Sequence, residues 1–298
     1  MRKLLMGIIV ILVVTNILTV VFMKNDKEDL TEGTEPVDEI DVKQPVASID
    51  DQDIYYDDWV AYLETNYGEE ALAEMIDRYV VKELANQQNL SVDPKIIDLE
   101  VSFLATLVGQ LPENKVKKIE AEWRENIEHR LLTDMLFAKD VTISEDKLRS
   151  YYDKYQSQYQ FSHRVELSHI VVENLETANR VYQELEEGAD FKALAYEYSI
   201  DEDSRSAGGY LGFFTKESSF LPANYFEKTR DIEEYQFSEP FLGSQGYVIL
   251  YLHRDLPTIE LGFNDLKDYI RVKIAIEELE TTPSIKDFWD EFNIDWIY

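Results

Sequence analysis

Apolar side chains recur every three or four residues between positions 72 and 155, which is the spacing that places them on one face of a helix. Asp93 followed by Pro94 predicts the start of one helix, with the aspartate as its cap and the proline at the first helical position. Thr142 and Glu145 have the spacing of a capping box at the start of another helix. We interpret most of the apolar positions as core: Leu72, Met75, Ile76, Tyr79, Val80, Ile97, Val101, Leu104, Val108, Val116, Ile119, Trp123, Ile127, Leu131, Leu148, Tyr151, Tyr152 and Tyr155.

The pattern changes at residue 164. Residues 164–172 alternate, which predicts a strand whose inner face carries Val165, Leu167, His169 and Val171. An amphipathic helix closed by Gly188, a second helix over 191–198, a loop with Gly208-Gly209, a short helix near Phe226 and an apolar strand over 246–253 follow. This order of strands and helices indicates a compact α/β or α+β domain.

Further elements are predicted at the two ends of this arrangement. Residues 46–54 indicate a short strand and turn. After the central domain, Phe263, Leu266, Ile270 and Ile274 form a helical stripe, and residues 292–298 are predicted to close the chain as a strand.

The N-terminus contains an uncharged apolar run, residues 4–23, directly after Arg2 and Lys3. At ~1.5 Å per residue this run matches the ~30 Å hydrocarbon layer, whereas the apolar part of a signal peptide usually has only ~7–15 residues. It therefore predicts an uncleaved membrane anchor (residues 1–23) whose positive end stays in the cytoplasm. Residues 24–45, with eight acidic residues and three lysines, are predicted to form an acidic linker outside the membrane.

Composition narrows the function classes. The chain has 29 basic and 60 acidic residues, a net charge of −31, so its field repels phosphates and a nucleic acid is not an expected partner. It has no cysteine, which excludes disulfides, thiolate zinc sites and cysteine nucleophiles. Its four histidines lack metal-binding spacing, and it has no phosphate-binding loop, so neither a metal nor a cofactor is expected.

Four segments in order resemble the parvulin-type peptidyl-prolyl isomerases: "LSHIVV", "ADFKALAYEYSID", "GGYLGFF" and "FSEPFLGSQGYVILYL", between residues 163 and 254. The anchor, the "ASIDDQDI" segment, the amphipathic helices and the C-terminal helix resemble the PrsA and SurA type of extracytoplasmic foldase. The expected fold class is therefore α+β. A parvulin domain with a small sheet flanked by helices (159–256) is expected to be inserted into a mostly helical chaperone domain (46–158 and 257–298), after an N-terminal transmembrane helix.

The resemblance implies a proline-binding pocket behind the glycine pair. Gly208 and Gly209 are expected to turn the backbone where side chains would clash, with positive φ. The side chains expected to bind the substrate are Leu211, Phe214, Phe220, Phe226 and Gln245. For the four apolar residues the alternative is ordinary core packing, and the match is weakest for Phe226, because the segment from Phe220 to Phe226 is longer than in short parvulins.

The resemblance also implies two residues beside the twisting amide, His169 and Asp201. His169 corresponds to the first of two histidines in the centre of the family's site, and Val248 stands where the second is expected. Valine neither donates nor accepts a hydrogen bond, so the histidine pair is broken. A histidine restored at position 248 is expected to raise activity. His169 is equally well explained as a satisfied core histidine, and without the resemblance Asp201 is better explained as the cap of a turn.

Two functions follow. The first is a membrane-anchored peptidyl-prolyl cis–trans isomerase and foldase on the extracytoplasmic side of the plasma membrane, acting on unfolded exported proteins with Xaa-Pro segments. The alternative is a non-catalytic chaperone with a degenerate parvulin domain. For the helical apolar positions, the alternative to core packing is that some of them line a groove for an unfolded client.

The anchor gives the first testable prediction. We expect the chain recovered from membranes to keep residues 4–23, because that run is long enough to span and no cleavage motif follows it. N-terminal sequencing of the purified protein checks this. A mature N-terminus between Val20 and Val46 would contradict it.

Overall fold

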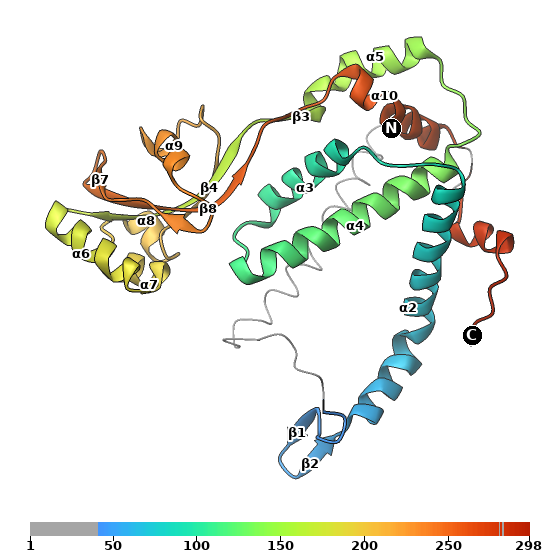
Figure 1. Ribbon diagram of the computed structural model, residues 1–298, viewed down its shortest axis with the longest axis horizontal. Helices are drawn as coiled ribbons and strands as arrows, with labels where there is room; N and C mark the ends of the chain where they lie inside the picture. Colours follow the sequence, from blue (N-terminus) through green and yellow to red (C-terminus); the bar gives the residue numbers. More distant parts are fainter. Residues whose placement is uncertain (1–40, 280, 282) are drawn as a thin grey trace, which may run out of the picture. The chain divides into compact units, whose positions relative to one another are not determined.

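The computed structural model describes residues 41–279, 281 and 283–298 (Figure 1). The predicted anchor (4–23) and most of the predicted linker (24–45) lie outside the described residues. Among the helices that are described, none combines the length and the apolar character needed to cross a membrane. The described chain forms two compact units, residues 41–77 with 294–298 and residues 78–293.

The first unit contains the predicted strand and turn. Strands β1 (Ala47–Ile49) and β2 (Gln52–Ile54) pair antiparallel, with Asp50 at φ 53° in the turn between them. Helix α2 (Tyr56–Gln87) begins directly afterwards. The strand predicted over residues 292–298 is wrong: this segment joins no sheet, and the Tyr298 hydroxyl donates to the Glu64 carbonyl on α2.

Helices dominate the first part of the second unit. They are α3 (Pro94–Val108), α4 (Glu113–Phe137), α5 (Glu145–Tyr155) and α10 (Phe263–Glu278), with 3-10 helices η1 (Gln156–Tyr159) and η3 (Ile285–Glu291). The cap at Asp93 is confirmed, because its carboxylate accepts a hydrogen bond from the Lys95 amide. The capping box at Thr142 is wrong: α5 is capped at Ser144, without a side-chain hydrogen bond.

Not every apolar position on the predicted helices is core. Met75 and Tyr79 on α2 are each 67% exposed, although Val80 beside them is buried. Helical spacing identifies a face but not whether another element covers it, and here the burial on α2 is confined to its C-terminal part.

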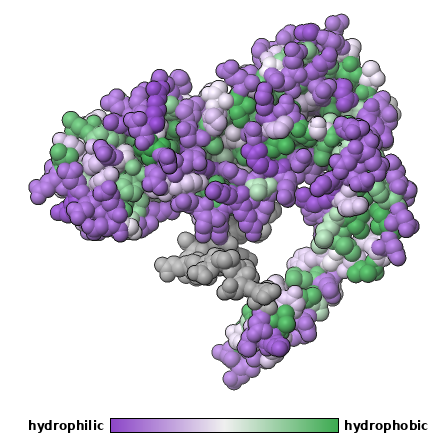
Figure 2. Space-filling model, in the orientation of Figure 1, coloured by the Kyte–Doolittle hydropathy of each residue, from purple (hydrophilic) through white to green (hydrophobic). Residues whose placement is uncertain are grey.

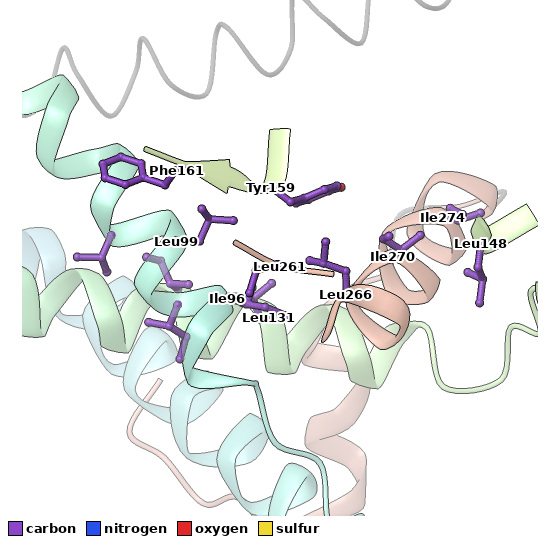
Figure 3. Close-up of a cluster of buried hydrophobic side chains, with 13 residues drawn as sticks. Ile96, Leu99, Leu131, Leu148, Tyr159, Phe161, Leu261, Leu266, Ile270 and Ile274 are labelled. Carbon is purple, nitrogen blue, oxygen red and sulfur yellow. The ribbon is translucent and has the colours of Figure 1, made fainter. Parts of the chain in front are cut away.

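The largest hydrophobic core joins segments from both sides of the central domain (Figure 3). Side chains from α3, α4 and α5 pack together with Leu266, Ile270 and Ile274 of α10. Strand β3 (Gln160–Phe161) pairs antiparallel with β9 (Ile259–Glu260), and Phe161 and Leu261 are part of the same core. The chain therefore leaves and re-enters the helical region side by side, as an inserted domain requires. The domain boundaries themselves remain a prediction.

The segment between these strands forms an antiparallel sheet. Its order is β5 (Tyr210–Phe214), β4 (Arg164–Val172), β8 (Tyr247–Leu256) and β6 (Gln236–Phe237), and β7 (Phe241–Leu242) also pairs with β8. Helices α6 (Leu175–Glu186) and α7 (Phe191–Tyr198) cover one face, where they pack on Ile170 and Ile249. The one-turn helix α9 (Tyr225–Lys228) lies on the other face (Figure 1). Helix α8 (Glu202–Arg205) precedes β5.

A buried ion pair connects this sheet to the helical region. The Arg254 Nε donates to Glu166 Oε2 over 2.6 Å, and both residues are at most 3% exposed. The Tyr210 hydroxyl donates to the other Glu166 oxygen over 2.8 Å. The Arg254 Nη2 donates to the carbonyls of Ala105 (3.2 Å) and Gly109 (3.1 Å) at the end of α3. One guanidinium thus binds a strand carboxylate and a helix terminus together.

Removing the carboxylate tests this connection. We expect Glu166→Ala to destabilise the sheet by about 3 kcal/mol, because the buried Arg254 charge loses its nearest counterion and keeps only the Glu120 carboxylate, 3.8 Å away. Asp98→Ala is the matched control, because Asp98 pairs with Arg124 at the surface and exposed pairs contribute little. Amide hydrogen exchange of β4 and β8 measures the local stability. Equal protection in both variants would contradict the connection.

Candidate active site

The glycine pair shapes the entry to one face of the sheet. Gly208 and Gly209 have φ of 66° and 79°, the left-handed region that favours glycine. A Cβ on Gly209 would lie 2.2 Å from the His169 carbonyl oxygen, and one on Gly208 would lie 2.8 Å from the Lys192 Cβ. The Gly209 carbonyl also accepts the His169 amide hydrogen over 2.9 Å. The predicted positive φ is confirmed, and the turn brings the loop against β4 at His169.

His169 lies at the centre of a polar network and is only 5% exposed. Its Nε2 is 2.9 Å from Asp201 Oδ2 and 3.0 Å from Ser204 Oγ. Its Nδ1 is 2.9 Å from the Tyr225 hydroxyl. The Ser204 hydroxyl also donates to Asp201 Oδ2 over 2.5 Å. Both imidazole nitrogens therefore have partners, from α8 and α9.

The partners define where the proton on the imidazole lies. Burial alone raises the pKa of Asp201, but hydrogen bonds from Ser204 and His169 outweigh it and lower the pKa below its usual range. Burial lowers the pKa of His169, against the opposing effect of Asp201. Near neutral pH the imidazole is therefore neutral and the carboxylate ionised. A carboxylate only accepts, so Nε2 carries the hydrogen and Nδ1 accepts from the Tyr225 hydroxyl.

A cavity of about 190 Å³ opens above this network. Six of the seven predicted site residues line it: His169, Asp201, Leu211, Phe214, Phe220 and Gln245. Val248 also lines it, as does Val171, which the sequence places on the same strand face as His169. The other lining residues were not indicated by the sequence: Asp203, Pro222, Tyr225 and Ser244. The arrangement offers an apolar seat beside a few fixed polar groups, which suits a small apolar ring with a polar bond next to it.

The prediction for Phe226 is corrected. This side chain is 5% exposed and packs in the core with Val165, Leu167 and Leu252, and it does not line the cavity. Its neighbour Tyr225 faces the cavity instead. Both lie on a helix of a single turn, where adjacent residues point in different directions, so an error of one position changes the side chain's role. Ser204 was also missed, although it follows Asp201 by the three residues typical of a cap.

Phe220 differs from the other apolar lining residues. It is 89% exposed, whereas Leu211 and Phe214 are half-buried in strand β5. A phenyl ring so exposed at the edge of a cavity is a surface that a bound ligand would cover.

Val248 is fully part of the cavity wall. It is 1% exposed and packs with Val171, Tyr225 and Leu250. In the β4–β8 register it pairs with Val171, while His169 pairs with Leu250. Val248 therefore lies two residues from the position opposite His169, on the same face, and contributes apolar surface only.

The opposite face of the sheet carries a second polar pair. The His253 Nε2 is 2.7 Å from the Ser168 hydroxyl, in a groove also lined by Phe191, Lys192 and Tyr251. Burial, assisted by the positive charges of Lys192 and Arg254, lowers the pKa of His253 to about 4.

Among the residues described in the structure, no cluster of three or more histidines and acids could hold a metal ion.

This chain is similar to known proteins along most of its length. The family model of the PPIC-type PPIASE domain matches residues 143–267. The Bacillus subtilis protein named "Putative peptidyl-prolyl cis-trans isomerase YacD" is 32% identical over 256 residues, which are 86% of each chain. The foldase protein PrsA of Halalkalibacterium halodurans is 28% identical over 219 residues, 70% of this chain and 64% of PrsA. The crystal structure of PrsA from Bacillus subtilis is 21% identical, with 84% of this chain and 91% of PrsA covered at a TM-score of 0.30.

The pKa of His253 predicts a pH dependence of stability. The folded chain keeps this imidazole neutral down to about pH 4, whereas the unfolded chain protonates it near pH 6.5. Between these values the unfolded state binds more protons, so the free energy of unfolding falls as the pH is lowered from 6.5 toward 4. We expect His253→Gln to weaken this dependence in denaturant titrations at pH 7 and pH 5. An unchanged difference between the two pH values would contradict the assignment.

Proposed function

We propose that this chain, which belongs to the parvulin (PPIC-type) family of peptidyl-prolyl cis–trans isomerases, isomerises Xaa-Pro bonds in the cavity beside His169. The observation that carries the proposal is the hydrogen-bonded set of His169, Asp201, Ser204 and Tyr225 beneath an apolar cavity. The set is built on β4, α8 and α9, and the glycine pair brings it together.

The reaction needs little more than such a cavity. The barrier to rotation about an Xaa-Pro bond comes from amide resonance and is ~18–20 kcal/mol. Rotation breaks no bond and transfers no proton, so a catalyst acts by binding the twisted amide better than the planar one. The planar amide is the more charge-separated form, and an apolar site disfavours it relative to the twisted one.

The residues divide this task between them. Leu211, Phe214 and Val248 form an apolar seat for the proline ring, and Phe220 covers it from the exposed side. His169 and Asp201 hold fixed dipoles and charge next to the seat, because each is hydrogen-bonded on more than one side. Fixed groups need no reorganisation as the amide twists, which is how preorganised polar sites lower a barrier.

A chaperone role beside isomerisation has its own support. The first unit exposes large hydrophobic and aromatic side chains on the hairpin and α2: Ile49, Ile54, Tyr55, Trp59, Tyr62, Leu63 and Tyr67. Figure 2 shows hydrophobic residues, in green, at the surface among hydrophilic ones. A shallow apolar depression is lined by Val46, Ala47, Ile54 and Trp59. Exposed apolar surface of this extent is typical of binding sites, and we propose that it binds apolar segments of unfolded exported proteins.

The location is part of the proposal. The uncharged run 4–23 supports a single transmembrane helix, with Arg2 and Lys3 on the cytoplasmic side and the domains on the extracytoplasmic side. The acidic segment that follows supports a solvated tether between the membrane and the first domain.

Phe220 tests the isomerase function. We expect Phe220→Ala to leave stability unchanged, because the ring is 89% exposed in the free protein. It should lower kcat/KM on an Xaa-Pro peptide roughly 5- to 30-fold, because the substrate loses apolar contact at ~25 cal/mol per Å². Tyr196→Ala is the matched control, since Tyr196 is 64% exposed and outside the cavity.

A protease-free isomerisation assay on residues 46–298, with thermal melts of each variant, makes this measurement. Equal activity of the parent, Phe220→Ala and Tyr196→Ala would place the seat elsewhere. A folded parent without activity would favour the non-catalytic chaperone, for which the buried Val248 in place of a histidine is the supporting observation.

A further inference from the structure

We propose that the Tyr225 hydroxyl takes the place of the second histidine of the parvulin site, by holding His169 in one orientation for isomerisation. Tyr225 is then a positioning residue, and the broken histidine pair is not a sign of lost function. The inference rests on the proposed isomerase function, and it concerns a residue that the sequence did not single out.

The tyrosine ring is itself held in place. Tyr225 is 2% exposed and meets His169 edge to face, with ring centroids 5.7 Å apart and planes at 69°. On another side it meets the Phe241 ring of β7, with centroids 5.8 Å apart and planes at 84°. Asn224 begins α9 in the left-handed conformation, φ 71°, and so turns the following residue toward the sheet. The hydroxyl therefore has a fixed position relative to β4.

The hydrogen bond has a defined direction. The Nε2 of His169 carries the hydrogen and contacts Asp201 and Ser204. The Nδ1 therefore has a lone pair that needs a hydrogen-bond donor. Burial raises the pKa of Tyr225, with Asp201 contributing, so the phenol keeps its hydrogen. Within the part of the chain that the structure describes, Nδ1 hydrogen-bonds to no other side chain. Removal of the hydroxyl would leave a buried acceptor unsatisfied.

Val248 fits the same arrangement. It packs directly on Tyr225, and both line the cavity. With Nδ1 and Nε2 both occupied, an imidazole at position 248 would find no free nitrogen on His169. A valine there adds apolar wall to the seat instead. The chain thus divides between two residues what a second histidine would supply alone: Tyr225 gives the polar contact and Val248 gives the surface.

Tyr225→Phe is the direct test, because it removes the hydroxyl and keeps the ring. We expect kcat on an Ala-Pro peptide to fall about five- to thirtyfold, which is the loss typical of an unsatisfied buried group, with KM little changed. The matched control is Tyr198→Phe, which removes a tyrosine hydroxyl bonded to Glu184 over 3.2 Å on α6, outside the cavity. This control should retain the parent's kcat and KM.

Nitrogen NMR gives a readout independent of activity. In ¹⁵N-histidine-labelled protein, the His169 Nδ1 resonance should be that of a hydrogen-bonded acceptor, and it should move toward the free-acceptor position in Tyr225→Phe but not in Tyr198→Phe. A merely space-filling tyrosine would leave it unchanged. An unchanged Nδ1 resonance together with unchanged kcat in folded Tyr225→Phe overturns the proposal. A parent inactive on every Xaa-Pro peptide would refute the isomerase function, while the NMR comparison still decides the hydrogen bond.

Val248→His provides the second variant. Against the sequence-based expectation, we expect a loss of activity when it is made alone, because the imidazole replaces apolar wall of the seat and finds no free nitrogen on His169. In the Tyr225→Phe background it should recover activity, since Nδ1 is then available. Equal gains in the two backgrounds, with thermal melts that show folded proteins, would mean that Tyr225 does not substitute for the histidine.

Discussion

The buried imidazole of His169 is the constraint on which the site depends. At 5% exposure in the middle of β4, it requires hydrogen-bond partners for both ring nitrogens, and these come from two separate segments, α8 and α9. Its backbone amide adds a third, the glycine turn at Gly209. Each segment is short, and the polar centre connects all three to one strand. The cavity is the space that remains between them.

Strand β4 carries the site on one face and is bonded to the helical region through its other face. Its residues alternate between faces, so His169 points to the cavity while Glu166 and Ser168 bond on the other side of the sheet. There Glu166 holds Arg254, which reaches the carbonyl end of α3 in the helical core. The β3–β9 pair closes the same junction, because it brings both ends of the inserted segment together. The sheet is thus fixed to the helical region by its back face and by its two connections, which leaves the cavity face free.

The sequence predicted elements well wherever the signal was local and strong. The cap at Asp93, the alternating strand at 164–172 and the positive φ of Gly208 and Gly209 all follow from short-range sterics and periodicity, and the structure contains them. The sequence predicted poorly which side chains are buried or line the cavity, because tertiary contacts determine this. Phe226 and Tyr225 differ by one position on a single helical turn, which no periodicity resolves. The exposure of Met75 and Tyr79, and the absence of a strand at 292–298, depend on whether another element packs against these residues. Only part of the network at His169 was predicted from the sequence. Asp201 lies in a motif of the resembled family, whereas Ser204 and Tyr225 are identified only by their distance to the imidazole.

An isomerase of this kind needs a fixed orientation of its central imidazole, not a particular set of polar residues. Amide rotation transfers no proton, so the imidazole is useful for its fixed dipole and for the groups that it aligns, not as an acid or base. A histidine in that role needs its orientation locked, and any buried donor of the right geometry can lock it. Once a tyrosine hydroxyl does so, a second imidazole is a polar group without a partner at a dry position, and a valine is the better wall. Position 248 is therefore informative only together with position 225, and the pair has to be considered as one unit.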